Sequence, residues 1–181
     1  MSEITRLLNE PGSEPNLKAV FERLYPELKN LARARLAAMG SGHTMTPTAL
    51  VHEAYVKLVQ ADQLDLQGRR HFFACASKAM RNIIVDYLRS GGAQKRGGDQ
   101  VGITLTENLP GDETPGSILD LDHALDELDE ISPEQRELVE MKFFAGLSIR
   151  EIAELMEVSN RTAWRHWQRA RAFLHARMAE S

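Results

Sequence analysis

Cationic side chains gather near the end of the chain, where they could neutralise a polyanion. Residues 159–178 hold no acidic residue and five arginines: Arg161, Arg165, Arg169, Arg171 and Arg177. Arginine carries a planar fork of N–H donors that matches phosphate oxygens and the edge of guanine. Asn160 and Thr162 add short polar groups at the start of the same segment. This composition predicts nucleic-acid binding, and a solvated basic helix face is the plainer alternative.

Aromatic and basic residues are interleaved in a second segment, residues 69–89. It contains Phe72 and Phe73 near its start and Arg81 and Asn82 in its second half. Unpaired bases stack on aromatic rings while cations follow the backbone, so this mixture suits single-stranded nucleic acid. Core packing is the alternative for most of the aromatic residues. Because Phe72 and Phe73 are adjacent, we expect only one of them at the centre of an apolar helix face.

Residues that could support catalysis or hold a metal do not form a recognisable set. His52-Glu53 resembles the start of a zinc-protease helix, but Val56 stands at the i+4 position that needs the second histidine. There is no P-loop, and a single cysteine, Cys75, allows neither an internal disulfide nor a cysteine-cluster metal site. We therefore expect no catalytic residue, no metal and no cofactor.

The net charge of −4 conceals a strong segregation of acids from bases. Residues 118–140 hold nine acids against the single cation Arg136, and residues 66–98 hold seven Lys and Arg against the single acid Asp86. Local basic faces decide binding to a polyanion, because screening limits the interaction to about 10 Å. No apolar run approaches the roughly 20 residues that span a bilayer, and no signal peptide is visible. We expect a reduced, cytoplasmic protein that does not enter the membrane.

Helical periodicity runs through almost every segment that could position these residues. Apolar residues recur every three or four positions in four segments, residues 17–36, 50–59, 72–87 and 118–128. Pro26 should kink or split the first helix. Thr46-Pro47 should cap and open the second helix. No strand pattern of comparable strength appears, so the predicted fold class is all-α.

The composition divides the chain into two small helical domains. Residues 90–116 are dominated by glycine, charged residues and the prolines Pro110 and Pro115, which is typical of an extended linker. The predicted domains are residues 1–90 and 117–181, joined by a flexible linker at 91–116.

The last fifty residues predict a helix-turn-helix. Gly146 ends one helix, and Ser148 with Glu151 three residues later forms the capping box of the next. A short turn, in which Val158 is expected to be buried, leads to a second helix capped by Ser159. The apolar side of this second helix is expected to hold Ala163, Trp164, Trp167, Ala170 and Leu174, whereas Asn160, Arg161, Thr162, Arg165 and Gln168 point away. The first residues of such a helix reach base edges, and later arginines, here Arg169 and Arg171, meet phosphates.

Several segments resemble the extracytoplasmic-function family of RNA polymerase sigma factors, in its minimal two-domain branch. Residues 72–89, with Met80-Arg-Asn-Ile-Ile-Val-Asp86 at the centre, are similar to the promoter-melting region of that family. Leu50-Val-His-Glu-Ala-Tyr-Val-Lys-Leu58 resembles the preceding helix, which docks on the polymerase. Residues 132–137 and 147–171 resemble the C-terminal promoter-binding domain, so the resemblance covers most of the chain in the right order.

The resemblance implies partners and a division of labour. Core RNA polymerase would be bound through its β′ clamp helices and β flap, and the clamp-binding residues would be Leu50, Val51, Glu53 and Tyr55. The first domain would capture an unpaired base of the minus-ten element of promoter DNA with the loop at 61–68 and the following helix. The resemblance implies that Phe72, Arg81 and Asn82 would belong to that site. The second domain would recognise the minus-thirty-five element with the helix that begins after Ser159.

The sequence departs from the family pattern just before the clamp-binding helix. Members of the family usually carry acids there, whereas this chain has Thr46-Pro-Thr-Ala49. Phosphorylation would add about −1.5 to −2 charges. A Ser/Thr protein kinase acting on Thr48 or Thr46 could therefore restore the negative charge that family members present to the polymerase clamp. Thr48 is the preferred site because Thr46 is expected to be committed to capping. Control by an anti-sigma factor stays open.

Two other classes of protein fit part of the pattern. A helix-turn-helix regulator could bind duplex DNA without polymerase, and co-purification with core polymerase would discriminate it from a sigma factor. A structural helical adaptor would leave the arginine-rich last helix without a role.

Overall fold

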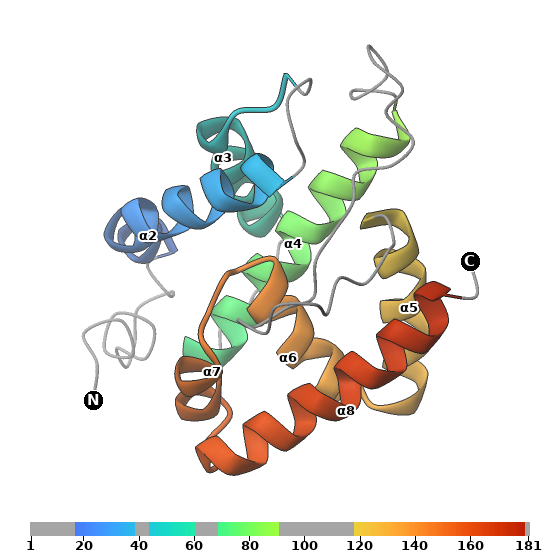
Figure 1. Ribbon diagram of the computed structural model, residues 1–181. Helices are drawn as coiled ribbons and strands as arrows, with labels where there is room; N and C mark the ends of the chain where they lie inside the picture. The colour runs from blue at the N-terminus through green and yellow to red at the C-terminus, as the bar shows by residue number, and fades with distance from the viewer. Residues whose placement is uncertain (1–16, 39–43, 61–68, 91–117, 180–181) are drawn as a thin grey trace.

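The computed structural model describes residues 17–38, 44–60, 69–90 and 118–179. In chain order its helices are α2 (Leu17–Ala38), α3 (Pro47–Gln60), α4 (Arg69–Arg89), α5 (Ile118–Ile131), α6 (Pro133–Phe143), α7 (Ile149–Leu155) and α8 (Asn160–Ala179) (Figure 1). No strand occurs within these ranges, so the all-α prediction is confirmed. No helix among them is long and apolar enough to span a bilayer. The loop at 61–68 and the linker at 91–116, both predicted from the sequence, lie outside the described residues.

The N-terminal half is built around α3, which packs on both α2 and α4. The ring of Phe21, on α2, meets Tyr55 and Phe72 edge to face, with centroids 4.9 and 5.5 Å apart. Such ring pairs contribute beyond the burial of their area. The aromatic residues thus tie the three helices into one core.

Local signals account for the starts and the course of these helices. The hydroxyl of Thr46 accepts a hydrogen bond from the backbone N–H of Ala49 at 3.1 Å, which confirms Thr46 as the cap of α3. α2 continues through Pro26 as a single helix, so of the two outcomes expected there, a kink or a split, the split does not occur. Buried residues on both sides of Pro26, among them Leu24 and Leu28, hold α2 on the core.

The C-terminal half surrounds α8, which packs on α5, α6 and α7. Ala163 and Ala170 are fully buried and allow these helices to approach closely, and Trp167 fills the space beside them. α6 begins in the same way as α3, with a hydroxyl cap followed by proline: Ser132 caps it and Pro133 occupies its first turn.

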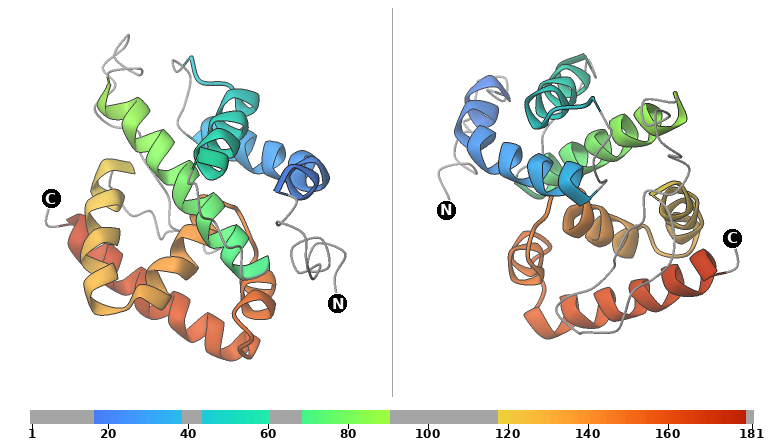
Figure 2. Two further views of the ribbon diagram at one scale, coloured as in Figure 1. Left: turned by 180° about the vertical axis from the view of Figure 1, so that it is seen from behind. Right: turned by 45° about the horizontal axis from the view of Figure 1, so that its top comes forward.

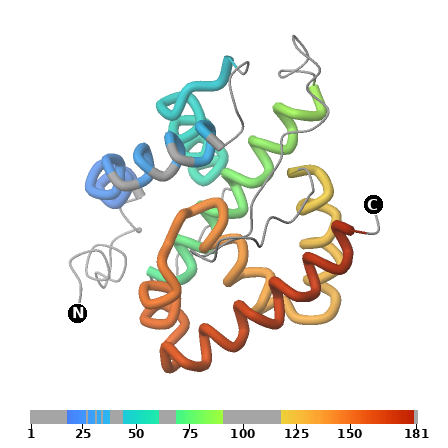
Figure 3. Tube along the Cα trace, in the orientation of Figure 1, coloured from blue at the N-terminus to red at the C-terminus, as the bar shows by residue number. Residues whose placement is uncertain are grey.

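The two halves pack against each other through α4, which lies along α5 and α6 (Figures 1 and 2). α8 lies on the far side of this contact from α3 (Figure 3). Arg35, on α2, reaches the same junction, where it donates a hydrogen bond to the carbonyl oxygen of Lys142 at 3.3 Å. Its guanidinium also stacks 4.6 Å from the ring centre of Phe143, and burial lowers the pKa of Arg35.

Candidate nucleic-acid interface

The helix-turn-helix is formed by α7 and α8, and the predicted capping box is confirmed. The backbone N–H of Ser148 donates to the Glu151 carboxylate at 2.8 Å, and the backbone N–H of Glu151 donates to the Ser148 hydroxyl at 3.2 Å. The hydrogen bonds from Ser148 hold the pKa of Glu151 below its usual value. Two of the orphan donors at the start of α7 are therefore satisfied reciprocally, which fixes where the helix begins.

The turns around α7 use two left-handed residues. Gly146 has φ 63°, a conformation that costs glycine little, and it ends the preceding segment as predicted. Glu157 has φ 56°, which allows the N–H of Val158 to bond back to the Ala153 carbonyl at 3.0 Å. Val158 was expected to be buried, but it is only half-buried, because it covers the edge of the core.

The start of α8 is capped by Ser159, whose hydroxyl accepts from the N–H of Thr162 at 3.1 Å. The Thr162 hydroxyl also lies 2.9 Å from that of Ser159, so the side chain of Thr162 is engaged in the cap. Asn160, Arg161 and Arg165 are exposed. The first turns of α8 therefore present one amide and two guanidinium groups to solvent.

Further along α8 the basic face continues with less exposure. Arg169 is exposed, whereas Arg171 is half-buried. Arg177, near the end, pairs with Glu127 of α5 at 2.9 Å, so it serves the packing of α8. Three exposed arginines, Arg161, Arg165 and Arg169, therefore lie in the first half of the helix, whereas the exposed Arg177 near its end is engaged with α5.

One expectation about α8 was wrong. Trp164 was expected on the apolar side, but 41% of it is exposed, whereas Trp167 is 2% exposed. Trp164 and Ala163 are adjacent, and the core has room only for the small side chain at this point. The indole of Trp164 thus stands among the exposed arginines.

In α4 the aromatic residues are core residues. Phe72 and Phe73 are 0% and 2% exposed, and their rings meet edge to face at 5.4 Å. The expectation that only one of them is central was wrong, because α4 is covered by α3 on one side and by α5 and α6 on another. In this arrangement Phe72 has no surface on which a base could stack.

Arg81 is also buried, with 4% of the residue exposed. Its guanidinium contacts the carboxylates of Asp122 at 2.7 Å, Asp126 at 2.6 Å and Glu140 at 2.8 Å. Burial alone would lower the pKa of Arg81, but the hydrogen bonds that its guanidinium donates to the three carboxylates outweigh burial and raise that pKa. Arg81 is therefore held as a cation inside the contact between the two halves.

The exposed side of α4 carries a polar stripe. Lys78, Asn82, Asp86 and Arg89 recur along this side and are all exposed. Together with Asp122, Asp126, Asp129 and Arg136 they line a polar hollow between α4 and α5. Asn82 is thus the one predicted promoter-melting residue of α4 that faces solvent in this arrangement.

Sequence reasoning missed the acids that meet Arg81. Asp122 follows Ile118 by four positions and precedes Leu125 by three, so it falls on the apolar face of α5. Glu140 stands between Val139 and Met141, which are both fully buried. In the sequence each of these two acids stands among apolar residues of its helix. That pattern could have shown that the two acids are buried and not solvated.

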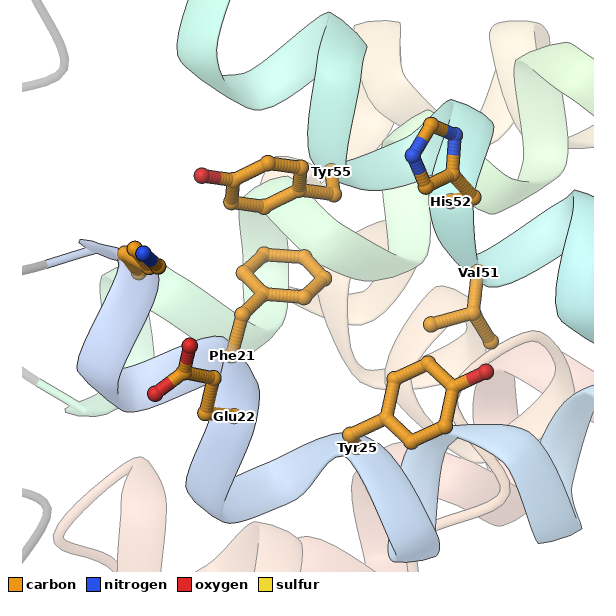
Figure 4. A pocket seen from close by; sticks show the side chains of 7 residues that line it. Phe21, Glu22, Tyr25, Val51, His52 and Tyr55 are labelled. Carbon is orange, nitrogen blue, oxygen red and sulfur yellow. The ribbon is translucent and has the colours of Figure 1, made fainter.

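The predicted polymerase-binding residues lie at different depths in α3. Leu50 and Val51 are 0% and 1% exposed, so in this arrangement they support the helix from the core. Glu53 is exposed, and Tyr55 is half-buried. Figure 4 shows Tyr55 and Val51 on one wall of an apolar groove between α2 and α3, with Phe21 and Tyr25 on the other.

Thr46, which precedes α3, and Thr48, in its first turn, are both exposed. The hydroxyl of Thr46 is engaged as the cap, and the first turn of α3 contains no acid. Within the described residues no group of His, Cys, Asp or Glu is arranged to hold a metal ion.

Comparison with known proteins gives one match. The family model described as ECF sigma factor matches residues 1–180. No significant match is found among curated proteins or solved structures.

Proposed function

The chain belongs to the ECF sigma factor family, and from this membership we propose how its helices share the work of promoter recognition. It directs core RNA polymerase to promoters, and its partners are that polymerase and promoter DNA. We expect it to act in the cytoplasm, where both partners are available. Its role is to initiate transcription, not to catalyse a reaction of its own.

In this proposal α8 recognises the upstream, minus-thirty-five element. The observation that carries the assignment is the capped start of α8, from which Asn160, Arg161 and Arg165 project into solvent. The first residues of a recognition helix reach base edges in the major groove. Arg169 and Arg171 follow at the positions where phosphate contacts are expected, and Thr162 fixes the helix start through its bond to Ser159.

Binding to matched and scrambled upstream elements tests this assignment. Substitution of Arg161 or Arg165 should weaken binding to the matched element more than to the scrambled one. Arg177→Ala is the control, because Arg177 pairs with Glu127 and stands away from the start of the helix. Equal losses on both DNA sequences for every variant would reduce α8 to a phosphate-binding helix.

The exposed stripe of α4 is proposed to meet the unpaired strand of the minus-ten element. Asn82 supplies an amide for a base edge, while Lys78 and Arg89 supply cations for the backbone. Phe72 supports this stripe from the core. Arg81 could join the DNA site only after its contacts with α5 and α6 have been released.

The clamp-binding surface is proposed to be the exposed side of α3. Glu53 is its carboxylate, and Tyr55 and the apolar groove beside it supply area for packing. Leu50 and Val51 contribute by holding α3 in place. Co-purification with core polymerase tests this surface, with Glu53→Gln and Tyr55→Ala expected to reduce recovery. Glu154→Gln, the same change of charge at an exposed position of α7, is the control.

Phosphorylation of Thr48, or less favourably of Thr46, is proposed to strengthen the interaction with the polymerase clamp. The first turn of α3 lacks an acid, and a helix N-terminus stabilises negative charge. Thr48 is exposed, whereas the hydroxyl of Thr46 already accepts the capping bond. A Ser/Thr protein kinase would thus supply the charge that the sequence omits.

Measured affinities for core polymerase test whether phosphorylation strengthens this interaction. The proteins compared are the unmodified protein, Thr48→Glu, Thr46→Glu and protein treated with a Ser/Thr kinase. We expect the phosphorylated protein to bind best and Thr48→Glu to bind better than Thr46→Glu, which loses the cap. Tight binding by the unmodified protein, with no gain on phosphorylation, would mean that a kinase does not control its binding to the polymerase.

A further inference from the structure

Arg81 is enclosed by acids that come from the other half of the chain. Asp122 and Asp126 belong to α5 and Glu140 belongs to α6, and all three contact its guanidinium within 2.8 Å. The guanidinium also donates to the backbone carbonyl of Asp122 at 2.8 Å. Every polar contact described for the Arg81 side chain therefore crosses between the two halves.

Three more arginines cross the same junction. Arg70 makes a two-pronged contact with Glu137, at 2.8 and 3.0 Å. Arg89 reaches Asp122 at 3.0 Å, and Arg35 reaches the carbonyl oxygen of Lys142. The N-terminal half supplies the cations of this junction, and the C-terminal half supplies the acceptors.

The charged contacts of this junction separate more readily than an apolar core does. Glu140 and Asp122 are 1% and 6% exposed, and a buried carboxylate is tolerated only while its cation is present. If the halves part, water solvates both the acids and the guanidinium groups, which offsets much of the lost attraction. Contacts between domains that move are typically polar in this way.

We propose that this junction is a closing contact in which the acids of α5 and α6 take the place of nucleic-acid phosphates on α4. Asp122, Asp126 and Asp129 line the same hollow as Lys78, Asn82 and Arg89. These carboxylates exclude a DNA backbone from this face of α4, because they occupy and neutralise the cations of α4 that would bind it. The closed protein cannot present α4 to an unpaired promoter strand, and it opens when core polymerase or DNA outcompetes the acids.

The closing contact leaves the other DNA surface accessible. Asn160, Arg161 and Arg165 on α8 are exposed while the junction is formed. The closed protein can thus meet duplex DNA through α8 but cannot hold a melted strand. This part of the inference rests on the proposed roles of α8 and α4, whereas the closed arrangement itself does not.

The charge pair between Arg70 and Glu137 allows a clean test, because neither residue is placed in the DNA or polymerase surfaces. Arg70→Glu and Glu137→Arg should each open the full-length protein, which small-angle X-ray scattering would detect as a larger radius of gyration. The double variant should restore the compact form, because it rebuilds the pair in reverse. Glu130→Arg is the matched control, since Glu130 is exposed on α5 and undergoes the same change of charge.

Affinity for a single-stranded oligonucleotide with the minus-ten sequence gives a second readout. Both single variants should bind it about tenfold more tightly, because the competent open form becomes more populated. A charge effect alone would make Arg70→Glu bind more weakly, so the two explanations predict opposite signs. Asp122→Asn combined with Glu140→Gln, which changes no side-chain shape, should act like the single variants.

An extended wild-type protein, or single variants as compact as the wild type, would overturn the closing contact. If the variants open but neither they nor the wild type bind DNA or support transcription, the closing contact stands and the proposed function fails. These two failures are therefore distinguishable.

Trp164 supports a second inference from a separate observation. Its indole is 41% exposed on the face of α8 that also carries Arg161, Arg165 and Gln168. Arginines on both sides bring this face to DNA, and apolar side chains in the major groove contact the methyl group of thymine. We infer that Trp164 is a specificity-determining residue that recognises a thymine in the upstream element.

Replacement of each thymine by deoxyuridine, which removes only the methyl group, tests this inference. The wild type should lose about fourfold in affinity at one position. Trp164→Ala should be insensitive at that position, and Trp164→Phe should regain part of the difference. If Trp164→Ala keeps the wild-type ratio of thymine to deoxyuridine affinity at every position, the inference is wrong. If the wild type binds no element at all, the proposed function of α8 fails instead.

Discussion

The guanidinium of Arg81 lies 2.8 Å from the carboxylate of Glu140, although the two residues are 59 positions apart and belong to different halves of the chain. Glu140 is 1% exposed, so this pair is formed almost entirely out of water. Arg136 contacts the second oxygen of Glu140 at 2.7 Å. The carboxylate therefore keeps one cation from its own helix and takes the other from α4.

Loss of the Arg81 side chain should uncouple the two halves. Arg81→Ala removes one of the two cations that compensate the burial of Asp122 and of Glu140. We expect a cost of about 3 kcal/mol, because Arg89 still serves Asp122 and Arg136 still serves Glu140. We expect urea unfolding to change from one transition to two, since the halves relieve the buried charge by separating. Asp86→Ala, a charge deletion on the exposed side of α4, should keep the wild-type behaviour.

Arg165→Ala should reduce the sequence preference of duplex binding. If Arg165 contacts a base with two hydrogen bonds, the loss is about 1–3 kcal/mol on the matched upstream element and much smaller on a scrambled one. Titrations at a single fixed salt concentration measure both values. The assignment would be contradicted by an equal loss on the two DNA sequences.

The capping box of α7 should make stability depend on pH in a defined direction. Because the folded pKa of Glu151 lies below its usual value, its contribution is fully present above about pH 4.3 and is lost as the pH falls through the folded pKa. The difference in unfolding free energy between the wild type and Glu151→Gln should therefore be largest near pH 7 and shrink in acid. Glu154→Gln, on the same helix, is the control.

Ser148→Ala tests the other half of the same box. Removal of the hydroxyl that accepts from the Glu151 N–H should cost about 0.5–2 kcal/mol. Thermal unfolding measures the change, and Ser148→Asp, which can also cap, should recover most of it. An unchanged midpoint for Ser148→Ala would mean that the cap does not stabilise the motif.

Phe72 and Asn82 should fail in different ways when substituted. Phe72→Ala empties a fully buried site and should destabilise the fold by about 3–5 kcal/mol, so a pre-melted promoter rescues nothing. Asn82→Ala should leave stability unchanged, lower open-complex formation on duplex promoters and matter less on a pre-melted one. Chemical unfolding together with permanganate footprinting of the promoter separates the two outcomes.

Local signals predicted α7 and the start of α8 almost to the residue. The cap of α7 depends on Ser148 and Glu151, and the cap of α8 depends on Ser159 and Thr162, so each signal lies within one helical turn. The start of α3 was equally accessible, because Thr46 and Pro47 are neighbours. Caps are local chemistry and can be predicted from short stretches of sequence.

What could not be predicted depends on contacts between distant segments. Helical spacing places Ala163 and Trp164 only one position apart, so it cannot decide which of them faces the core. Phe72 and Phe73 are both buried because α4 is covered on two sides, and only the packing of both halves shows this. The role of Arg81 was assigned to DNA because its carboxylate partners begin 41 positions further along the chain.

Run-off transcription with purified core polymerase decides whether this protein is a sigma factor. Transcripts are measured on a genomic library with core polymerase alone, with the unmodified protein added, and with Thr48→Glu added. We expect no specific transcripts from core polymerase alone and discrete transcripts from a limited set of promoters when either form of the protein is present. If the protein binds duplex DNA but neither form supports any specific transcript, it does not act as a sigma factor.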